Sequence, residues 1–308
     1  MANPLKTDAL NLADHTASGI WQKNIKSGIL SQLCPDDPEI RVGTSTDYFT
    51  FTSTPKAELV GEGENKSSAD GTPTKVTSKT YKLQLTYRFS DEVRYADAEE
   101  RLRLIQALAG RIAKGTSRGM DLVAIHGINP KTGASAQTVS EYITRSGNGV
   151  NIVTADASDV YKDLEGAAAK LQGAGYSATG IAIDPVYAGV LARARKANGD
   201  KYFPGMGLGF NVTELEGIRA AVSNTVSGSQ ELPGAISTGV GAIMADWDAF
   251  KWGIAANVPL EFIEFGDPDG AGDLKRNNQI AIRAEVIFGF GILDPKAFTI
   301  IKQAQVSA

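Results

Sequence analysis

The chain has 308 residues, 42% of them hydrophobic and 21% charged, which is enough apolar material for one large or two modest cores. Its net charge of −4 argues against a protein that binds nucleic acid through a basic surplus. Cys34 is the only cysteine, so no intrachain disulfide can form. The sequence has neither the long apolar run of a membrane-spanning helix nor the apolar start of a signal peptide, so no membrane partner is expected.

Residues 1–44 are expected to form an extended arm with one short helix over 19–33. The sequence Pro35-Asp36-Asp37-Pro38 ends that helix, because proline lacks a backbone N–H and disfavours helix at the preceding residue.

Residues 46–126 are predicted to form two strands joined by a polar tip, followed by one long helix. In residues 81–89, apolar and polar residues alternate as in a half-buried strand, and the aromatic run 48–51 is its expected partner. The tip, 61–71, has no apolar residue larger than alanine. A two-stranded arm of this kind has too little core to be stable alone in water. We therefore expect it to lie on a neighbouring subunit.

The long helix is predicted over 97–125, after a short helical lead from Asp91. Asp97 and Glu100 have the spacing of a capping box at its start. Its apolar stripe consists of Leu102, Ile105, Ala109 and Ile112. Three glycines within it indicate either a bend, which we favour, or a close crossing; they are Gly110, Gly115 and Gly119.

A different pattern begins near residue 151 and indicates an α/β block. A helix from Val160 is expected to stop at Gly173 or Gly175, before a short buried strand over 180–183. Asp184-Pro185 opens a further helix that is expected to end at Asn198-Gly199, before a glycine-rich loop. Strict alternation over 279–292 predicts a strand of about 14 residues that runs along the long helix in the same domain.

Residues that carry catalytic or metal chemistry are few. His15 and His126 are far apart, and the sequence has no zinc-ligand spacing, so we predict no metal site and no cofactor. The acidic stretch Asp267-Pro268-Asp269-Gly270 with Asp273 admits a calcium site, although a plain turn is the preferred interpretation. Trp247 and Trp252 are expected to be core or interface anchors.

Five stretches, in order along the chain, are similar to those of one known family: 57–63 (AELVGEG), 81–83 with 89–93 (YKL and FSDEV), 198–203 (NGDKYF), 278–283 (NQIAIR) and 294–298 (DPKAF). No single stretch is specific, but the ordered set resembles the major capsid proteins of tailed bacteriophages, the Hong Kong 97 fold family, over nearly the whole chain.

The resemblance implies an α+β fold of the Hong Kong 97 type in five parts. They are an N-terminal arm (1–44), an extended β-hairpin loop or E-loop (45–89), a peripheral domain with a long spine helix and long β-strands (90–150), an inserted axial α/β domain (151–266) and a terminal strand that returns to the peripheral domain (267–308).

The function that it implies is a major capsid protein that self-assembles into hexamers and pentamers of an icosahedral phage head enclosing double-stranded DNA, without specific DNA binding. An encapsulin-type shell is the alternative within the fold. A soluble oligomeric enzyme is the alternative of another class, and the lack of a convergent catalytic set argues against it.

The resemblance also implies which residues make contacts, and with which partners. The inter-subunit loop comprises Gly61, Glu62, Gly63, Glu64, Asn65 and Lys66, and the axial loop comprises Asn198, Gly199, Asp200, Lys201 and Tyr202. Many family members begin with a helical scaffolding segment, which this sequence lacks, so either a separate scaffolding protein is expected or a shell that needs none. Further expected partners are a portal and a decoration protein. The expected location is the virion capsid, assembled in the host cytoplasm.

Some family members cross-link the subunits of their shells through a lysine–asparagine isopeptide bond. Alignment places Lys66 at the lysine, Asn278 at the asparagine and Glu285 at the proton-accepting glutamate. Such a lysine must lose its proton and such a glutamate must be desolvated. Arg283 shares a strand face with Glu285 and would weaken it as a base. The preferred alternative is a polar strand face and a solvated loop lysine.

Overall fold

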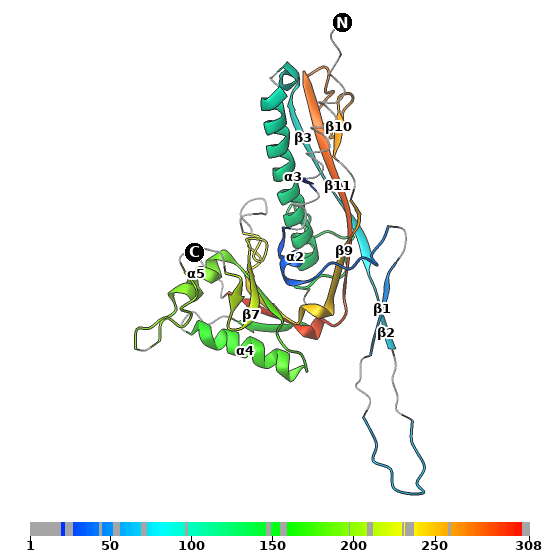
Figure 1. Cartoon of the computed structure of the whole chain (residues 1–308), viewed down its shortest axis with the longest axis vertical. Helices are drawn as coiled ribbons and strands as arrows, with labels where there is room; N and C mark the ends of the chain where they lie inside the picture. Colours follow the sequence, from blue (N-terminus) through cyan, green and yellow to red (C-terminus); the bar gives the residue numbers. More distant parts are fainter. Residues whose placement is uncertain are drawn as a thin grey trace.

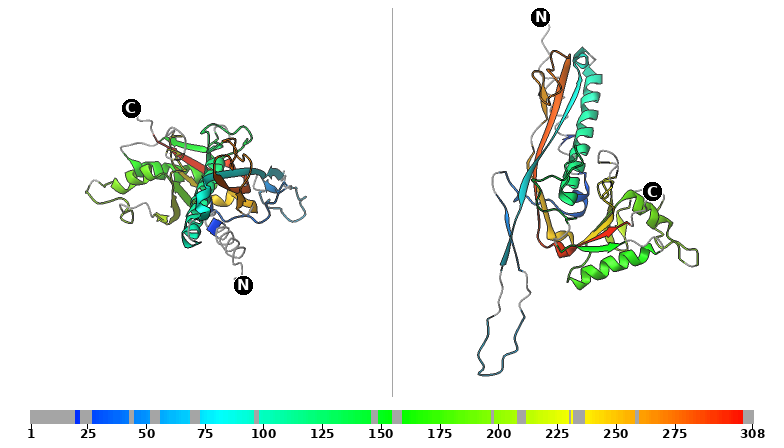
Figure 2. Two further views of the ribbon diagram at one scale, coloured as in Figure 1. Left: turned by 90° about the horizontal axis from the view of Figure 1, so that it is seen from above. Right: turned by 180° about the vertical axis from the view of Figure 1, so that it is seen from behind.

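The structure is a computed structural model that describes residues 20–21, 27–42, 45–51, 56–68, 73–95, 98–145, 149–154, 159–196, 198–207, 212–229, 231, 237–257 and 260–303. The molecule is elongated. A long helix and long strands follow its main axis, a second unit lies to one side, and a narrow hairpin projects beyond the body (Figures 1 and 2). None of the described helices is long and apolar enough to cross a membrane.

One half of the body, here called the helix–ribbon unit, packs a helix along a narrow antiparallel sheet. Strand β11 pairs with β3 from Gln279↔Ser90 to Phe290↔Lys79, and it also pairs with β9 and β10. Its elements are α3 (Ala98–His126), β3 (Lys79–Ser90), β9 (Phe250–Asn257), β10 (Glu261–Ile263) and β11 (Gln279–Ile292). The predictions of a long helix and a 14-residue strand beside it are confirmed.

Helix α3 lies close to β3 at two of its glycines. A Cβ atom added to Gly115 would be 3.5 Å from Leu85 Cδ2, and one added to Gly119 would be 3.4 Å from Leu83 Cδ1. Figure 1 shows α3 as one straight helix. The predicted bend is therefore wrong, and these glycines mark the close crossing that was the alternative.

The projecting hairpin consists of β1 (Asp47–Phe51) and β2 (Pro73–Thr77), paired from Asp47↔Thr77 to Phe51↔Pro73. The expected pairing of 48–51 with 81–89 is therefore wrong. The alternating strand β3 belongs to the body, where β11 supplies its hydrogen bonds and Tyr81, Leu83 and Phe89 of its apolar face pack against the core that contains α3. Burial of that apolar face favours the body over the solvated arm.

The other half, here called the six-stranded unit, is a mixed sheet in the order β4-β12-β8-β5-β7-β6. The β5–β7 and β12–β4 pairs are parallel, and the other pairs are antiparallel. The strands are β4 (Asn151–Thr154), β5 (Gly180–Ile183), β6 (Glu214–Leu215), β7 (Ile218–Val222), β8 (Val240–Ala245) and β12 (Phe298–Lys302).

The two faces of this sheet belong to different cores. Ile243 and its face pack with α2 (Ile29–Leu33) and the end of α3, in the core shared with the helix–ribbon unit. Met244 and the opposite face pack under α4 (Val160–Gly173) and α5 (Pro185–Arg193). Alternation along each strand thus makes a layered α/β unit, fused to the helix–ribbon unit through one face.

Shorter elements connect these parts. The 3₁₀ turns within the described residues include η1 (Asp91–Tyr95), η3 (Trp247–Ala249) and η4 (Pro295–Ala297), and η1 is the predicted helical lead. Helix α4 ends at Gly173 as predicted, but α5 ends at Arg193 rather than near Asn198. The predicted helix over 19–33 is wrong as one continuous helix, because Ser27 and Gly28 are not helical and α2 begins only at Ile29. Residues 22–26 of that range and Asp97 lie outside the described residues. Trp247 and Trp252 are each 1% exposed, which confirms their core role.

Candidate inter-subunit surfaces and their supports

The hairpin is anchored to the body at its base. Tyr48 donates its hydroxyl hydrogen bond to Asp37 at 2.7 Å. Across the strands, Asp47 binds the Lys75 ammonium at 2.8 Å and accepts from the Thr77 hydroxyl at 2.7 Å. These polar contacts fix where the hairpin leaves the body, but they bury little apolar surface.

The loop beyond the hairpin, residues 56–68, is organised by its own polar groups. Glu58 accepts hydrogen bonds from the Ser67 backbone N–H at 3.1 Å and from the Ser67 hydroxyl at 2.5 Å. Glu64 accepts from the Gly61 N–H at 3.0 Å, and Gly63 supplies the left-handed backbone, with φ +84, for the turn. The loop therefore holds a defined shape away from the body (Figure 1).

Two large apolar side chains on this projection are exposed. Leu59, in the loop, is 99% exposed, and Phe49, on β1, is 67% exposed. Two strands without a cover have no hydrophobic core, and exposing such side chains forgoes roughly 1.5–3 kcal/mol each relative to burial. The projection is thus a candidate contact surface.

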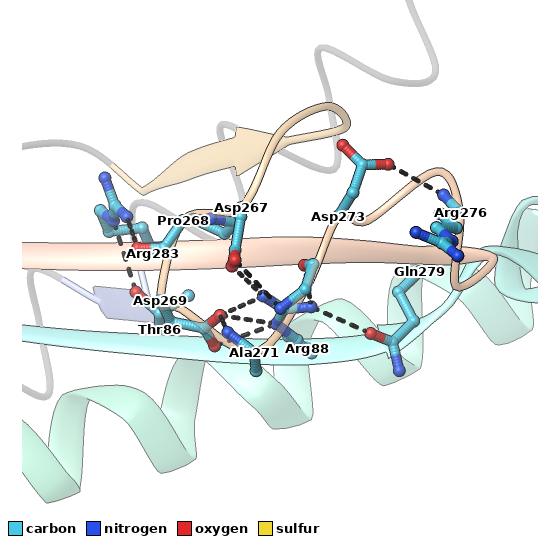
Figure 3. Close-up of polar contacts among 11 residues, drawn as sticks. Thr86, Arg88, Asp267, Pro268, Asp269, Ala271, Asp273, Arg276, Gln279 and Arg283 are labelled. Atoms are coloured by element: carbon cyan, nitrogen blue, oxygen red, sulfur yellow. Dashed lines mark hydrogen bonds and ion pairs between the residues drawn. The ribbon is translucent and has the colours of Figure 1, made fainter.

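A second polar cluster pins the loop that precedes β11. In Figure 3, Arg88 of β3 lies between Asp267 and Asp269. Its Nε donates to Asp269 at 2.8 and 3.0 Å, and its Nη2 donates to Asp267 at 2.8 Å and also to Asp269. Its Nη1 donates to the Gly272 carbonyl at 2.9 Å and to Gln279 Oε1 at 3.2 Å.

The acidic stretch that sequence analysis considered as a calcium site contains the two carboxylates that bind Arg88, those of Asp267 and Asp269. The hydrogen bond from Arg88 lowers the pKa of Asp269 and keeps its carboxylate charged. Among the described residues, no group of His, Cys, Asp or Glu side chains is arranged to hold a metal ion. Arg283 extends the same support, because its Nη2 donates to the Pro268 carbonyl at 2.6 Å (Figure 3).

A buried carboxylate joins three parts of the chain. Asp121 of α3 is 1% exposed and accepts the backbone N–H groups of Ile29 at 2.9 Å and Leu30 at 3.3 Å, at the start of α2. The Thr225 hydroxyl also donates to it, at 3.4 Å. Burial raises the pKa of Asp121 to about 7, opposed by these hydrogen bonds and by the charge of Arg118.

His126, at the end of α3, forms hydrogen bonds with the turn of the six-stranded unit that contains Thr225. Its Nε2 lies 2.9 Å from the Val226 carbonyl and 3.2 Å from the Thr225 carbonyl, so the N–H on Nε2 donates to them. Burial lowers the pKa of His126 to about 4. Asp184, the N-cap of α5, holds the turn from its other side by accepting from the Ser227 hydroxyl at 2.5 Å.

The predicted axial loop forms a small hairpin at the edge of the six-stranded unit. Asn198 and Asp200 bind each other twice, at 2.7 and 3.1 Å, and Gly199 takes φ +89 in the turn. Tyr202 stacks on Tyr161 of α4, with ring centroids 5.1 Å apart and an interplanar angle of 14°. The loop is thereby held against α4.

The three candidate cross-linking residues do not converge within one subunit. Lys66 lies in the projecting loop, whereas Asn278 immediately precedes β11 and Glu285 lies within that strand, seven positions further on. Glu285 forms an ion pair with Lys82 at 2.7 Å. A partly exposed ion pair differs from the apolar pocket that a proton-accepting glutamate requires.

Sequence reasoning missed Arg88, Asp121 and Asp184 as organising residues. Asp184 had a local signal as a helix cap, and only its reach to Ser227 was unforeseen. Arg88 and Asp121 have no local signal, since their partners are 179 to 191 and 91 to 104 positions away.

The fold thus combines an elongated body, a projecting hairpin with exposed apolar side chains and an edge loop held against α4, an arrangement suited to contacts with other chains. Comparison with known proteins agrees. A model of the phage capsid family matches residues 10–303. This chain therefore belongs to the phage capsid family, and it is a major capsid protein, a structural component of the virion capsid.

Solved structures show the same relationship. A chain from Mycobacterium phage Ogopogo is 37% identical with a TM-score of 0.79, covering 90% of this chain and 92% of that one. A chain from Gordonia phage Cozz is 30% identical with a TM-score of 0.74, covering 90% and 86%. The capsid of an empty GTA particle shares the fold at 16% identity and a TM-score of 0.61, over 89% of each chain. No curated protein matches the sequence.

Proposed function

We propose that this capsid protein builds hexamers and pentamers of an icosahedral head around double-stranded DNA, and that the β1–β2 hairpin with loop 56–68 lies on a neighbouring subunit. The observation that carries the proposal is the 99% exposure of Leu59 in the loop beyond a two-stranded hairpin that has no core of its own. A copy of the chain that covers Leu59 and Phe49 supplies the missing burial.

The charge of the chain fits a container wall. At a net charge of −4 the protein has no basic surplus, so it encloses DNA without binding it tightly or specifically. Assembly takes place in the host cytoplasm with a separate scaffolding protein and a portal, and a decoration protein binds the finished shell. The resemblance to tailed-phage capsid proteins supports these partners.

The five-part organisation follows the same family: arm 1–44, E-loop 45–89, peripheral domain 90–150, axial domain 151–266 and terminal strand 267–308. The observed contacts favour three adjustments to these boundaries. The E-loop ends near Ser78, because β3 pairs with β11 in the body. Strands β9 and β10 also pair with β11 and so leave the axial domain, whereas β12 joins the six-stranded sheet. With these changes the six-stranded unit corresponds to the axial domain.

A covalent shell is a second and less favoured proposal. It requires Lys66 of one subunit to reach Asn278 of another, with Glu285 released from Lys82. Assembled particles boiled in denaturant and run on a gel distinguish the two. A gel that shows only monomer bands indicates a non-covalent shell. A ladder of larger species that is present in the wild type and absent in Lys66→Arg demonstrates the isopeptide bond.

The shell itself is tested by gradient sedimentation and negative-stain microscopy of the purified chain, with and without phage factors. Closed particles that contain DNA after co-expression support the proposal. Particles that carry protein cargo and no nucleic acid support the encapsulin-type alternative. A compact monomer, with the hairpin protected against its own body, overturns the proposal.

A further inference from the structure

The six-stranded unit has an apolar groove with an acidic rim. Helix α4 and the β6–β7 hairpin border a hollow of about 360 Å³. Its floor includes the buried side chains of Leu164, Leu215 and Met244. Glu165 and Glu216 also line it, and both are exposed at its mouth. A binding partner for this groove would have to be apolar at its centre and basic at its edge.

The same unit has a second hollow with the opposite charge. It measures about 410 Å³, lies beside α5 and the axial loop, and shares no lining residue with the first. Arg193, Arg195 and Lys201 line it together with Val186, whose side chain is 58% exposed. The exposed side chains around this hollow, Val186, Arg193 and Arg195, have the apolar and basic character that the first groove requires of its partner.

The opposing charges are available for contacts outside the subunit. Within the part of the chain that the structure describes, Glu165, Glu216, Arg193 and Arg195 form no ion pair with one another or with other residues. Arg193 donates its Nε to the Gly189 carbonyl of its own helix at 3.0 Å, which leaves its remaining donors free to bind carboxylates.

The two hollows are also connected to each other through packed aromatic side chains. Tyr161 lines the acidic groove and stacks on Tyr202, which directly follows Lys201 of the basic surface. Phe203, 3% exposed, anchors the same loop in the core beneath α4 and α5. Both surfaces are thus preformed on one rigid unit, which lowers the entropic cost of docking.

We infer that the basic surface beside α5 docks into the acidic groove beside α4 of a second copy of this chain, head to tail around a capsomer. This inference rests on the proposed shell function. Two different, complementary surfaces on one chain make a heterologous contact, and such contacts close into rings when the rotation between copies permits. Charge complementarity sets the register, and burial of Val186 adds apolar contact.

Charge reversal tests the inference. Glu165→Lys/Glu216→Lys places two bases opposite the basic surface, and Arg193→Glu/Arg195→Glu places two acids opposite the acidic groove. Each double variant should lower the yield of closed particles by roughly tenfold or more, because like charges then face each other. The fourfold variant restores complementarity and the original net charge, and should recover particles.

Thermal melting and circular dichroism of each variant show whether it folds, and the single variants Arg195→Glu and Glu216→Lys repeat the test where a double variant melts early. If the wild type assembles and the double variants assemble equally well, or if folded fourfold protein fails to recover, the docking inference is overturned while the shell function stands. A wild type that never assembles overturns both.

Discussion

The Asp121 carboxylate accepts the backbone N–H of Ile29 at 2.9 Å, across 92 positions of sequence. This hydrogen bond connects the start of α2 to the C-terminal part of α3, where Asp121 lies. Gly28 makes the approach possible, since a Cβ atom there would lie 2.6 Å from both carboxylate oxygens. The start of α2 is therefore positioned by the long helix.

Replacing Asp121 should destabilise the folded chain. Asp121→Ala leaves the buried N–H groups of Ile29 and Leu30 without their acceptor, at a cost of about 1–3 kcal/mol for each. Denaturant unfolding measures the loss, with Lys131→Ala, an exposed turn residue, as the control. Equal stability of Asp121→Ala and the control would show that these bonds contribute nothing.

Asp121 and His126 should give opposite pH dependences. The pKa of Asp121 is raised by burial from 3.8 to about 7, so its stabilising contribution is full below pH 3.8 and is lost as pH rises to 7. The pKa of His126 is lowered by burial from 6.5 to about 4, so its contribution is full above pH 6.5 and is lost as pH falls to 4.

Unfolding free energies between about pH 4.5 and 7.5 separate the two groups. Relative to wild type, Asp121→Asn should become more favourable as pH rises, because the variant no longer buries an ionising carboxyl. His126→Gln should become more favourable as pH falls. Parallel pH profiles for the wild type and both variants would contradict these assignments.

Arg88→Met should loosen the loop before β11 without unfolding the body. The guanidinium is the shared donor to Asp267, Asp269 and the Gly272 carbonyl, so its removal leaves two acids close together without a cation. We expect faster proteolytic cleavage within 264–274. Lys82→Met, which removes only the ion pair with Glu285, is the matched control and should be cleaved at the wild-type rate.

Leu59→Ser should impair assembly while leaving the subunit fold intact. The side chain is 99% exposed in the single chain, so its removal costs the monomer nothing, whereas the assembled shell loses an apolar contact of roughly 1.5–3 kcal/mol per subunit. Analytical sedimentation compares particle yield with that of Glu62→Ser, an exposed neighbour in the same loop. Wild-type yields for Leu59→Ser would show that loop 56–68 does not dock through this residue.

Periodic patterns of apolar residues predicted the regular elements well. The alternation from Gln279 to Ile292 and the apolar stripe of α3 identified the two longest elements, because alternate residues are buried along most of β11 and exposed residues recur along α3 as far as Arg118. The end of α3, residues 119–126, is buried on every side, which the stripe did not predict. The same alternation in 81–89 identified a strand but not its partner, since a period of two says which face is buried and leaves open what pairs with the edge.

The end of α5 shows a related limit. Residues 194–198 carry no helix breaker before Asn198, yet the helix stops at Arg193, where Arg195 pairs with Lys201 in a short hairpin. The packing of Tyr202 on Tyr161 and of Phe203 in the core stabilises that hairpin, and neither contact is visible in local sequence.

The amino-acid order by itself determined the element types, the long helix, the terminal strand, the solvated loop and the family resemblance, because these depend on periodicity and on near neighbours. Tertiary structure alone decided which strands pair, how Arg88 meets Asp267 and Asp269, and how Asp121 holds the start of α2. The physical reason is that hydrogen bonds and ion pairs between distant positions depend on the packing that brings their elements together.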